Sequence, residues 1–136
     1  MSSPFIDSNV VLYLLSADEV KADRAQFLVE AGAVISVQVL NEVTSVCLRK
    51  LKMPWEEIDA LLEALKAGCE VLPITQLTHD KAIALAKRYK LAFYDANIVA
   101  AGILSGAKVL YSEDMHHGLQ MDGLTIYNPF IQSSPK

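Results

Sequence analysis

Short apolar runs alternate with longer helix-like segments along most of this chain, and the alternation constrains the fold more than any other feature. The runs have the length and composition of buried strands. They lie at residues 5–7, 33–36, 69–72, 108–111 and 124–127. Strands that alternate with helices predict a mainly parallel sheet covered by helices on both faces. We therefore expect an α/β fold in the form of a three-layer sandwich with five strands.

The segments between these runs have apolar residues at helical spacing. A short buried helix is expected directly after Asp7, and longer helices are expected over residues 22–31, 37–51, 54–68, 80–89 and 95–106. Ser36 and Thr78 are candidate N-caps of two of these helices. Asp95 stands where the last helix can begin.

The length and composition favour one compact domain. With 136 residues and 52% hydrophobic residues, the chain can bury a substantial core. We expect a single domain over residues 1–130 and a polar tail over 131–136. No apolar run approaches the roughly 20 residues of a membrane helix, and the first residues lack the pattern of a signal peptide. The sequence thus predicts a cytoplasmic protein that does not associate with membranes.

The cysteines and the charge exclude several kinds of site. Cys47 and Cys69 stand in no metal-ligand spacing, so we expect reduced, buried thiols. The net charge of −4 argues against broad electrostatic coating of a nucleic acid. Basic clusters at residues 49–52 and 87–90 leave room for a local basic rim, although helix C-termini carry such residues for dipole reasons alone. The chain has no dinucleotide fingerprint, P-loop or nucleophile elbow.

Four acids share one structural description: each follows a strand or lies on the inward side of an adjoining helix. They are Asp7, Glu42, Asp95 and Asp114. Singly, each has an ordinary alternative role as a helix cap, a turn residue or a solvated helical acid. In a parallel sheet, however, all four would face one crevice, where ligands of open α/β folds bind. Carboxylates packed so closely repel one another unless a cation joins them or some take up protons.

Oxygen ligands without His or Cys favour a hard ion, Mg²⁺ or Mn²⁺. Such an ion can activate a bound water and neutralise charge that grows on a phosphate, which is the chemistry of phosphodiester hydrolysis. Ser112 and Asn9 are placed to add hydrogen bonds to a carboxylate or a bound water, with capping as the alternative role for both.

The acids lie in motifs that resemble those of PIN domains, particularly the VapC-type toxin ribonucleases of type II toxin–antitoxin systems. The motifs are Phe-Ile-Asp7-Ser-Asn9, Asn41-Glu42, Tyr94-Asp95-Ala-Asn-Ile-Val-Ala-Ala and Leu110-Tyr-Ser112-Glu-Asp114-Met-His-His-Gly118. The resemblance implies the strand order 3-2-1-4-5 and cleavage of RNA that depends on Mg²⁺ or Mn²⁺. It also implies a homodimer and inhibition by a small antitoxin that occupies the active-site groove.

By this resemblance, a set of catalytic residues can be assigned. Asp7, Glu42, Asp95 and Asp114 match the family's metal-binding acids, and Ser112 matches its small hydroxyl residue. The residues after Asp114 depart from the family pattern, so Glu113 or Asp114 could face the metal; the spacing after Ser112 favours Asp114. We further expect RNA contacts from Asn9, Arg49 and Lys50.

Two other functions compete with the nuclease. One is a PIN-like module that binds RNA or a protein without productive hydrolysis, which the four intact acids disfavour. The other is a receiver-like or phosphatase-like domain with Asp7 as phosphoacceptor. A receiver would need paired acids before the phosphoacceptor and a Lys after a late strand, and the sequence offers no convincing match to either.

Overall fold

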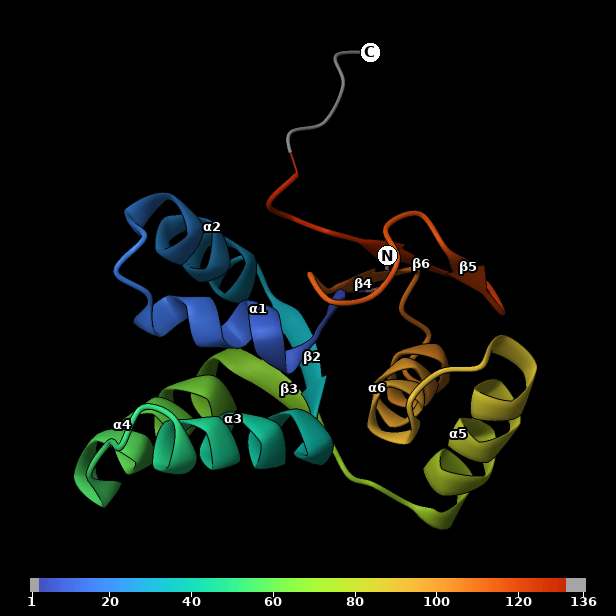
Figure 1. Ribbon diagram of the computed structural model, residues 1–136, viewed down its shortest axis with the longest axis horizontal. Coiled ribbons are helices and arrows are strands. Elements are labelled where there is room, and N and C mark those ends of the chain that lie inside the picture. Colours follow the sequence, from blue (N-terminus) through green and yellow to red (C-terminus); the bar gives the residue numbers. More distant parts are fainter. Residues whose placement is uncertain (1–2, 132–136) are drawn as a thin grey trace.

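The computed structural model of the chain describes residues 3–131 and contains one mainly parallel sheet (Figure 1). Its strands are β1 (Phe5–Ile6), β2 (Ala33–Ser36), β3 (Cys69–Leu72), β4 (Val109–Tyr111), β5 (Gln120–Met121) and β6 (Leu124–Tyr127). They lie in the order β3-β2-β1-β4-β6-β5. The five predicted strands are therefore all present, and their order 3-2-1-4-5 is confirmed.

The sixth strand, β5, is a difference from the prediction. It pairs antiparallel with β6 at the edge of the sheet, whereas the other strand pairs are parallel. The two strands are joined by Asp122 and Gly123, whose φ angles of 49° and 87° suit a tight hairpin turn. Strand β5 is only two residues long. A strand that short has no apolar run by which to recognise it.

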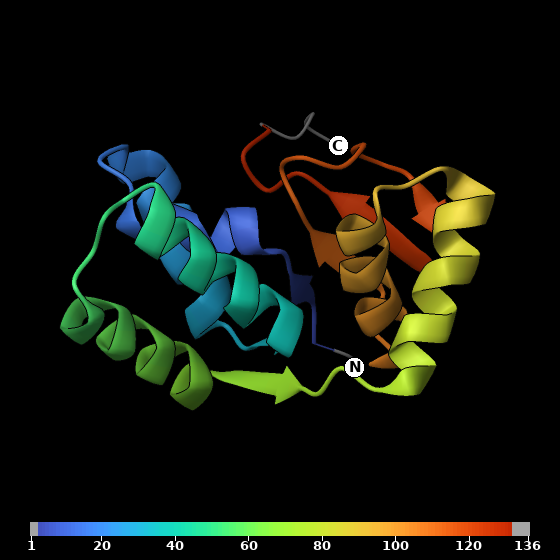
Figure 2. The same cartoon turned by 60° about the horizontal axis from the view of Figure 1, so that its bottom comes forward.

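Helices connect the strands. They are α1 (Ser8–Leu12), the 3₁₀ turn η1 (Tyr13–Leu15), α2 (Glu19–Glu30), α3 (Val37–Arg49), α4 (Trp55–Gly68), α5 (Gln76–Tyr89) and α6 (Phe93–Leu104). Figures 1 and 2 show α1 to α4 gathered at the β3–β2 end of the sheet. In both views α5 and α6 lie side by side near the other end.

Two predicted helix starts are corrected by the structure, and the third, at Ser36, is confirmed in position. Thr75, and not Thr78, caps α5; the two side chains form a reciprocal capping box. Helix α6 begins two residues before Asp95, which places Asp95 in the first turn. Ser36 occupies the N-cap position of α3, but its side chain makes no capping hydrogen bond.

Helix α6 lies at the centre of the core and carries one acid of the site. Its residues 96–102 are all buried. A Cβ atom added at Gly102 would lie 3.4 Å from Leu124 and 3.6 Å from Phe5, so the helix packs closely over β6 and β1. This packing fixes the helix N-terminus, and Asp95 with it, beside the carboxyl end of the sheet.

Other sequence predictions can be compared with the structure. Cys47 and Cys69 are both free and buried, as expected. Within residues 3–131, no helix is long and apolar enough to cross a membrane. The predicted polar tail lies outside the described residues except for Ile131.

Candidate functional site

The site is built around Asp7, the first residue after β1. Because β1 and β4 are paired in parallel, with Ile6 beside Tyr111, the residues that follow them are neighbours. The Asp7 backbone N–H donates to the Tyr111 carbonyl at 2.9 Å, and the Ser112 hydroxyl donates to Asp7 Oδ2 at 2.9 Å. Asp7 and Ser112 are both buried. The two strand ends thus meet as the parallel sheet predicts.

Asn9 links these strand ends through its side-chain amide. Its Nδ2 donates to Asp7 Oδ2 at 3.1 Å and to Ser112 Oγ at 3.3 Å. Its Oδ1 accepts from the Glu113 backbone N–H at 3.0 Å. The amide therefore braces the carboxylate and the loop after β4, which is the hydrogen-bonding role expected of it.

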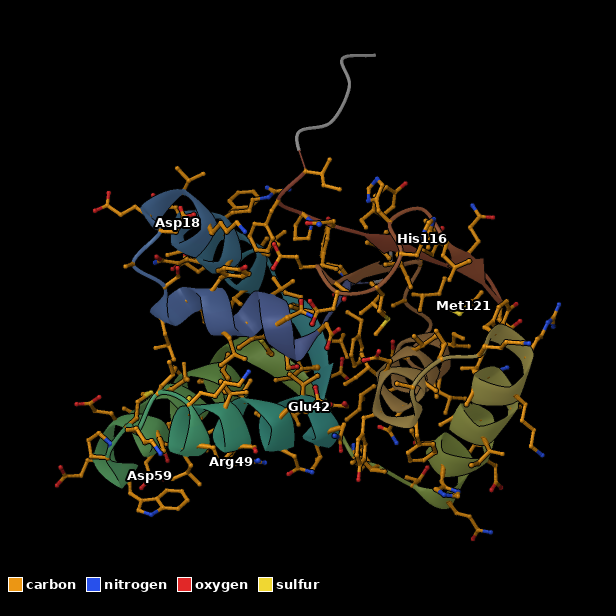
Figure 3. The ribbon with its side chains drawn as sticks, in the orientation of Figure 1. Asp18, Glu42, Arg49, Asp59, His116 and Met121 are labelled. Atoms are coloured by element: carbon orange, nitrogen blue, oxygen red, sulfur yellow. The ribbon has the colours of Figure 1, made fainter. Side chains whose placement is uncertain are left out.

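Glu42 reaches the site from α3 and is held by two neighbours. Ser8 Oγ donates to Glu42 Oε1 at 2.5 Å, and Gln38 Nε2 donates to Oε2 at 3.1 Å. Figure 3 shows Glu42 near the middle of the molecule, on the part of α3 that is nearer to α6. Sequence reasoning did not identify Ser8 or Gln38. Their signals were weak: Ser8 directly follows Asp7, and Gln38 precedes Glu42 by one helical turn.

Asp95 and Asp114 complete the group of acids. Asp95 is half-buried and Asp114 is exposed. Asp114 lines a hollow of about 390 Å³ together with Ser8, Glu42 and Lys50. Within residues 3–131, neither Asp95 nor Asp114 forms a side-chain hydrogen bond or ion pair. Their oxygens are therefore free to accept a ligand.

The pKa values of Asp7 and Asp95 are raised by burial and, in part, by the charges of the other acids. Burial raises the pKa of Asp7 to about 6; hydrogen bonds from Ser112 and Ser8 oppose this rise, and the charges of Glu42 and Asp95 add to it. Burial also raises the pKa of Asp95, and the charges of Glu42 and Asp114 raise it further. Each acid therefore lies in the field of at least one other.

Glu113, the other candidate in the last motif, points elsewhere. Its carboxylate accepts from Lys21 Nζ at 2.9 Å and from the Tyr13 hydroxyl at 2.5 Å. Burial alone would raise the pKa of Glu113, but the hydrogen bonds from Tyr13 and Lys21 lower it overall. The geometry therefore favours Asp114 as the acid that faces the hollow.

The carboxylates of the four acids are the kind of ligand that fits a hard divalent ion. In this structure their oxygens do not converge on one point. In the described part of the chain, no three His, Cys, Asp or Glu side chains are close enough to hold a metal between them. Glu42 is turned onto Ser8. None of the four acids is ion-paired with a Lys or Arg among residues 3–131. Uncompensated carboxylates around a hollow are the oxygen ligands that Mg²⁺ and Mn²⁺ prefer, often with waters between.

The predicted basic contacts differ in their positions. Lys50 lines the hollow with Asp114, and Arg49 is exposed on the same helix end. Figure 3 shows Arg49 farther out along α3 than Glu42. His117 has a local role, because its Nδ1 accepts from the Asn128 backbone N–H at 2.9 Å and its ring packs on Tyr127.

The fold and the acids define a class of α/β proteins with an acidic site at the carboxyl end of a parallel sheet. The model of the PIN domain family matches residues 5–117 of this chain. The chain therefore belongs to the PIN domain family. None of the curated proteins compared with it matches.

Solved structures of toxin–antitoxin proteins have the same fold. A toxin–antitoxin complex from Klebsiella pneumoniae has a TM-score of 0.73 and 22% identity over 94% of this chain and 98% of that chain. VapC20 from Mycobacterium tuberculosis, a Sarcin-Ricin loop cleaving toxin, has a TM-score of 0.68 and 21% identity. The match covers 82% of this chain and 90% of that chain. VapBC2 from Rickettsia felis, bound to promoter DNA, has a TM-score of 0.67 and 16% identity. The match covers 90% of this chain and 96% of that chain.

Proposed function

We propose that the protein is an endoribonuclease that depends on Mg²⁺ or Mn²⁺ and serves as the toxin of a toxin–antitoxin pair. One observation carries the proposal: Glu42 and Asp114 line one hollow, and the charges of Glu42, Asp95 and Asp114 act on one another and on the buried Asp7 beside it. Two of the acids, Asp7 and Asp95, have raised pKa values, and within residues 3–131 none of the four forms an ion pair with a Lys or Arg. A site of this kind needs a cation.

The proposed metal ligands are Asp7, Glu42, Asp95 and Asp114. A divalent ion held there supplies positive charge to the phosphate in the transition state and lowers the pKa of the attacking water. Asp7 is the most rigid of the four because it is buried and hydrogen-bonded by Ser112. Glu42 is the adjustable one, since it can exchange its hydrogen bond to Ser8 for the ion.

Neighbouring side chains have supporting roles in this proposal. Ser112 and Asn9 hold Asp7 in place through hydrogen bonds to its Oδ2. All the hydrogen-bonding groups of the Asn9 amide are used within the protein, so an RNA contact from Asn9 would have to replace one of them. Lys50, and Arg49 beside it, are placed to bind the RNA backbone.

The proposed partners follow from the relatives and from the surface beside the site. The solved relatives include a toxin–antitoxin complex and VapBC2 bound to promoter DNA. Next to the acids, a mostly apolar hollow of about 270 Å³ is lined by Leu12, Leu15, Val46 and Leu51 among others. An apolar segment of an antitoxin would fit there and cover the acids. We also propose a homodimer, a cytoplasmic location and a single domain over residues 1–130.

The main alternative is a PIN-like module that binds RNA or protein without cutting. To separate the two functions, purified protein is incubated with a panel of structured and single-stranded RNAs in Mn²⁺, with and without EDTA. The nuclease predicts cleavage that EDTA abolishes and that the Asp95→Asn variant lacks. Intact RNA across the whole panel would favour the binding module.

A further inference from the structure

We propose that Tyr94 and polar residues on one face of α3 form a subsite for one unstacked base of the RNA, directly beside the metal-binding acids. The inference rests on the proposed ribonuclease function and deepens it, because it names a single-stranded segment as the substrate class. The subsite consists of Tyr94, Gln38, Asn41 and Ser45.

Tyr94 lies next to the proposed chemistry and remains accessible. It is 62% exposed in the first turn of α6, and Asp95 follows it immediately. Its ring meets Phe93 edge-on with 5.6 Å between centroids, and Phe93 in turn packs against His79 at 5.5 Å. The neighbouring aromatic rings thus support the Tyr94 ring while most of it faces solvent. A supported, exposed ring is a platform on which a base can stack.

An exposed tyrosine is common on protein surfaces and needs a second observation to indicate a ligand. The second observation is a hollow of about 360 Å³ that Tyr94 lines with Gln38, Asn41, Glu42 and Ser45. Within residues 3–131, the side chains of Asn41 and Ser45 form no hydrogen bond. An amide and a hydroxyl beside an aromatic ring can pair with the edge of a base that stacks on the ring.

This hollow adjoins the one that Glu42 and Asp114 line. Glu42 and Ser45 line both of them, and the second hollow also contains Ser8, Asp114 and Lys50. A phosphate held between Lys50 and the acids would therefore place an adjoining base over Tyr94. The substrate must be single-stranded at this point, because a base inside a duplex cannot reach an aromatic platform.

The composition of the hollow favours RNA over a protein partner. The residues that line it with Tyr94 have polar or charged side chains; they are Gln38, Asn41, Glu42 and Ser45. The buried centre of a protein–protein interface is instead depleted of charge and largely apolar. The exposed apolar residues of α2, Val20 and Phe27, lie on a different helix from Tyr94.

The test measures RNA affinity in chains that cannot cut. Every variant carries Asp7→Asn, and binding of a fluorescein-labelled, single-stranded RNA 12-mer of mixed sequence is followed by anisotropy in Mn²⁺. Tyr94→Ala should weaken binding by about tenfold, within the range of one stacking contact, while Tyr94→Phe keeps the affinity of the parent. Phe27→Ala is the matched control, because Phe27 is 61% exposed on α2; it should bind as the parent does.

An abasic scan assigns the contact to a base. The 12-mer is made with an abasic residue at each position in turn. At one position the abasic residue should weaken RNA binding by the parent, the Asp7→Asn chain with Tyr94 intact, about tenfold. It should leave RNA binding by the Tyr94→Ala variant unchanged, because that variant already lacks the ring on which the base stacks. Equal affinities of Tyr94→Ala and the parent, equal abasic effects in both, or no measurable binding by the parent would each overturn the subsite.

The oligomeric state and the cleavage assay separate the remaining outcomes. A changed mass of Tyr94→Ala in light scattering, with unchanged RNA affinity, would make Tyr94 a contact between copies and overturn the proposal. Cleavage by the unmodified chain, with its EDTA control, tests the nuclease independently of Tyr94. If the unmodified chain cuts RNA but Tyr94→Ala binds RNA as the parent does, only the subsite is refuted. If Tyr94 contributes to binding but the unmodified chain cuts no RNA, only the nuclease function is refuted.

Discussion

Lys21 on α2 and Glu113 after β4 form an ion pair, with 2.9 Å between Nζ and Oε2. The Tyr13 hydroxyl donates to the same carboxylate, and Asn9 accepts from the Glu113 backbone N–H. The loop after β4 is thereby held on two sides. Glu113 is directed toward α2, which leaves the next residue, Asp114, at the hollow with Glu42.

This arrangement predicts that substitutions of Glu113 and Asp114 have very different effects on the rate of RNA cleavage. Asp114→Asn should reduce cleavage at least about 100-fold, because it removes a proposed metal ligand. Glu113→Gln should reduce it less than about tenfold, since a partly exposed ion pair contributes only about 1 kcal/mol or less. Initial rates on one RNA in Mn²⁺ decide the matter. The reverse order of the two effects would assign Glu113 to the metal.

Asp7→Asn is expected to abolish cleavage and leave the fold intact. The amide cannot replace a carboxylate as an anionic ligand, but it can still accept the Ser8 N–H bond that Asp7 accepts at 2.7 Å. Cleavage and far-UV circular dichroism are measured together. Asp59→Asn is the control, because Asp59 is exposed on α4, far from Glu42 in Figure 3. An unfolded Asp7→Asn chain would mean that Asp7 is structural.

The raised pKa of Asp7 predicts how the stability of the metal-free protein depends on pH. The folded chain holds the Asp7 proton up to about pH 6, whereas the unfolded chain releases it near 3.8. The contribution of protonated Asp7 to the free energy of unfolding is thus fully present below pH 3.8. It is lost as the pH rises through about 6. The loss amounts to up to about 3 kcal/mol.

Urea unfolding in EDTA at several pH values between 4 and 8 measures this effect. The comparison with Asp7→Asn isolates the contribution of Asp7, because all other titrating groups remain. The variant should gain stability relative to the unmodified chain as the pH rises. Parallel pH profiles for the two proteins would contradict the assigned burial and charge of Asp7.

The two basic residues at the end of α3 should differ in their effect on RNA binding. Lys50 lines the hollow and Arg49 does not, so we expect Lys50→Ala to weaken binding more than Arg49→Ala. Loss of one phosphate contact should lower the slope of log affinity against log salt by about 0.7 for a single strand. Metal affinity should stay unchanged in both variants. An unchanged salt slope for Lys50→Ala would remove it from the interface.

The sequence predicted the parts of the fold and site that depend on regular elements. Asp7 and Ser112 could be placed together because both follow strands of a parallel sheet, and the rule for such sheets brings their ends to one edge. Two residues of β5 carry no comparable pattern, so this strand was missed. The cap at Thr75 was assigned to Thr78 because the two threonines form a reciprocal box and only geometry distinguishes them.

Contacts between residues far apart in the sequence determine features of the site that the sequence motifs do not predict. The choice between Glu113 and Asp114 depends on Lys21, which lies 92 residues away and has no motif of its own. The hydrogen bond from Ser8 to Glu42 spans 34 residues and depends on how α1 and α3 pack. Packing between helices follows from the whole fold, and no local spacing encodes it.

Manganese binding tests the central claim most directly, because it needs neither RNA nor an active enzyme. Free Mn²⁺ is titrated against the purified chain and followed by electron paramagnetic resonance, with Asp95→Asn and the Asp59→Asn control in parallel. We predict saturable binding by the unmodified chain and by Asp59→Asn, and an affinity at least about tenfold lower for Asp95→Asn. Absence of binding by the unmodified chain, or equal affinity in Asp95→Asn, would contradict the account.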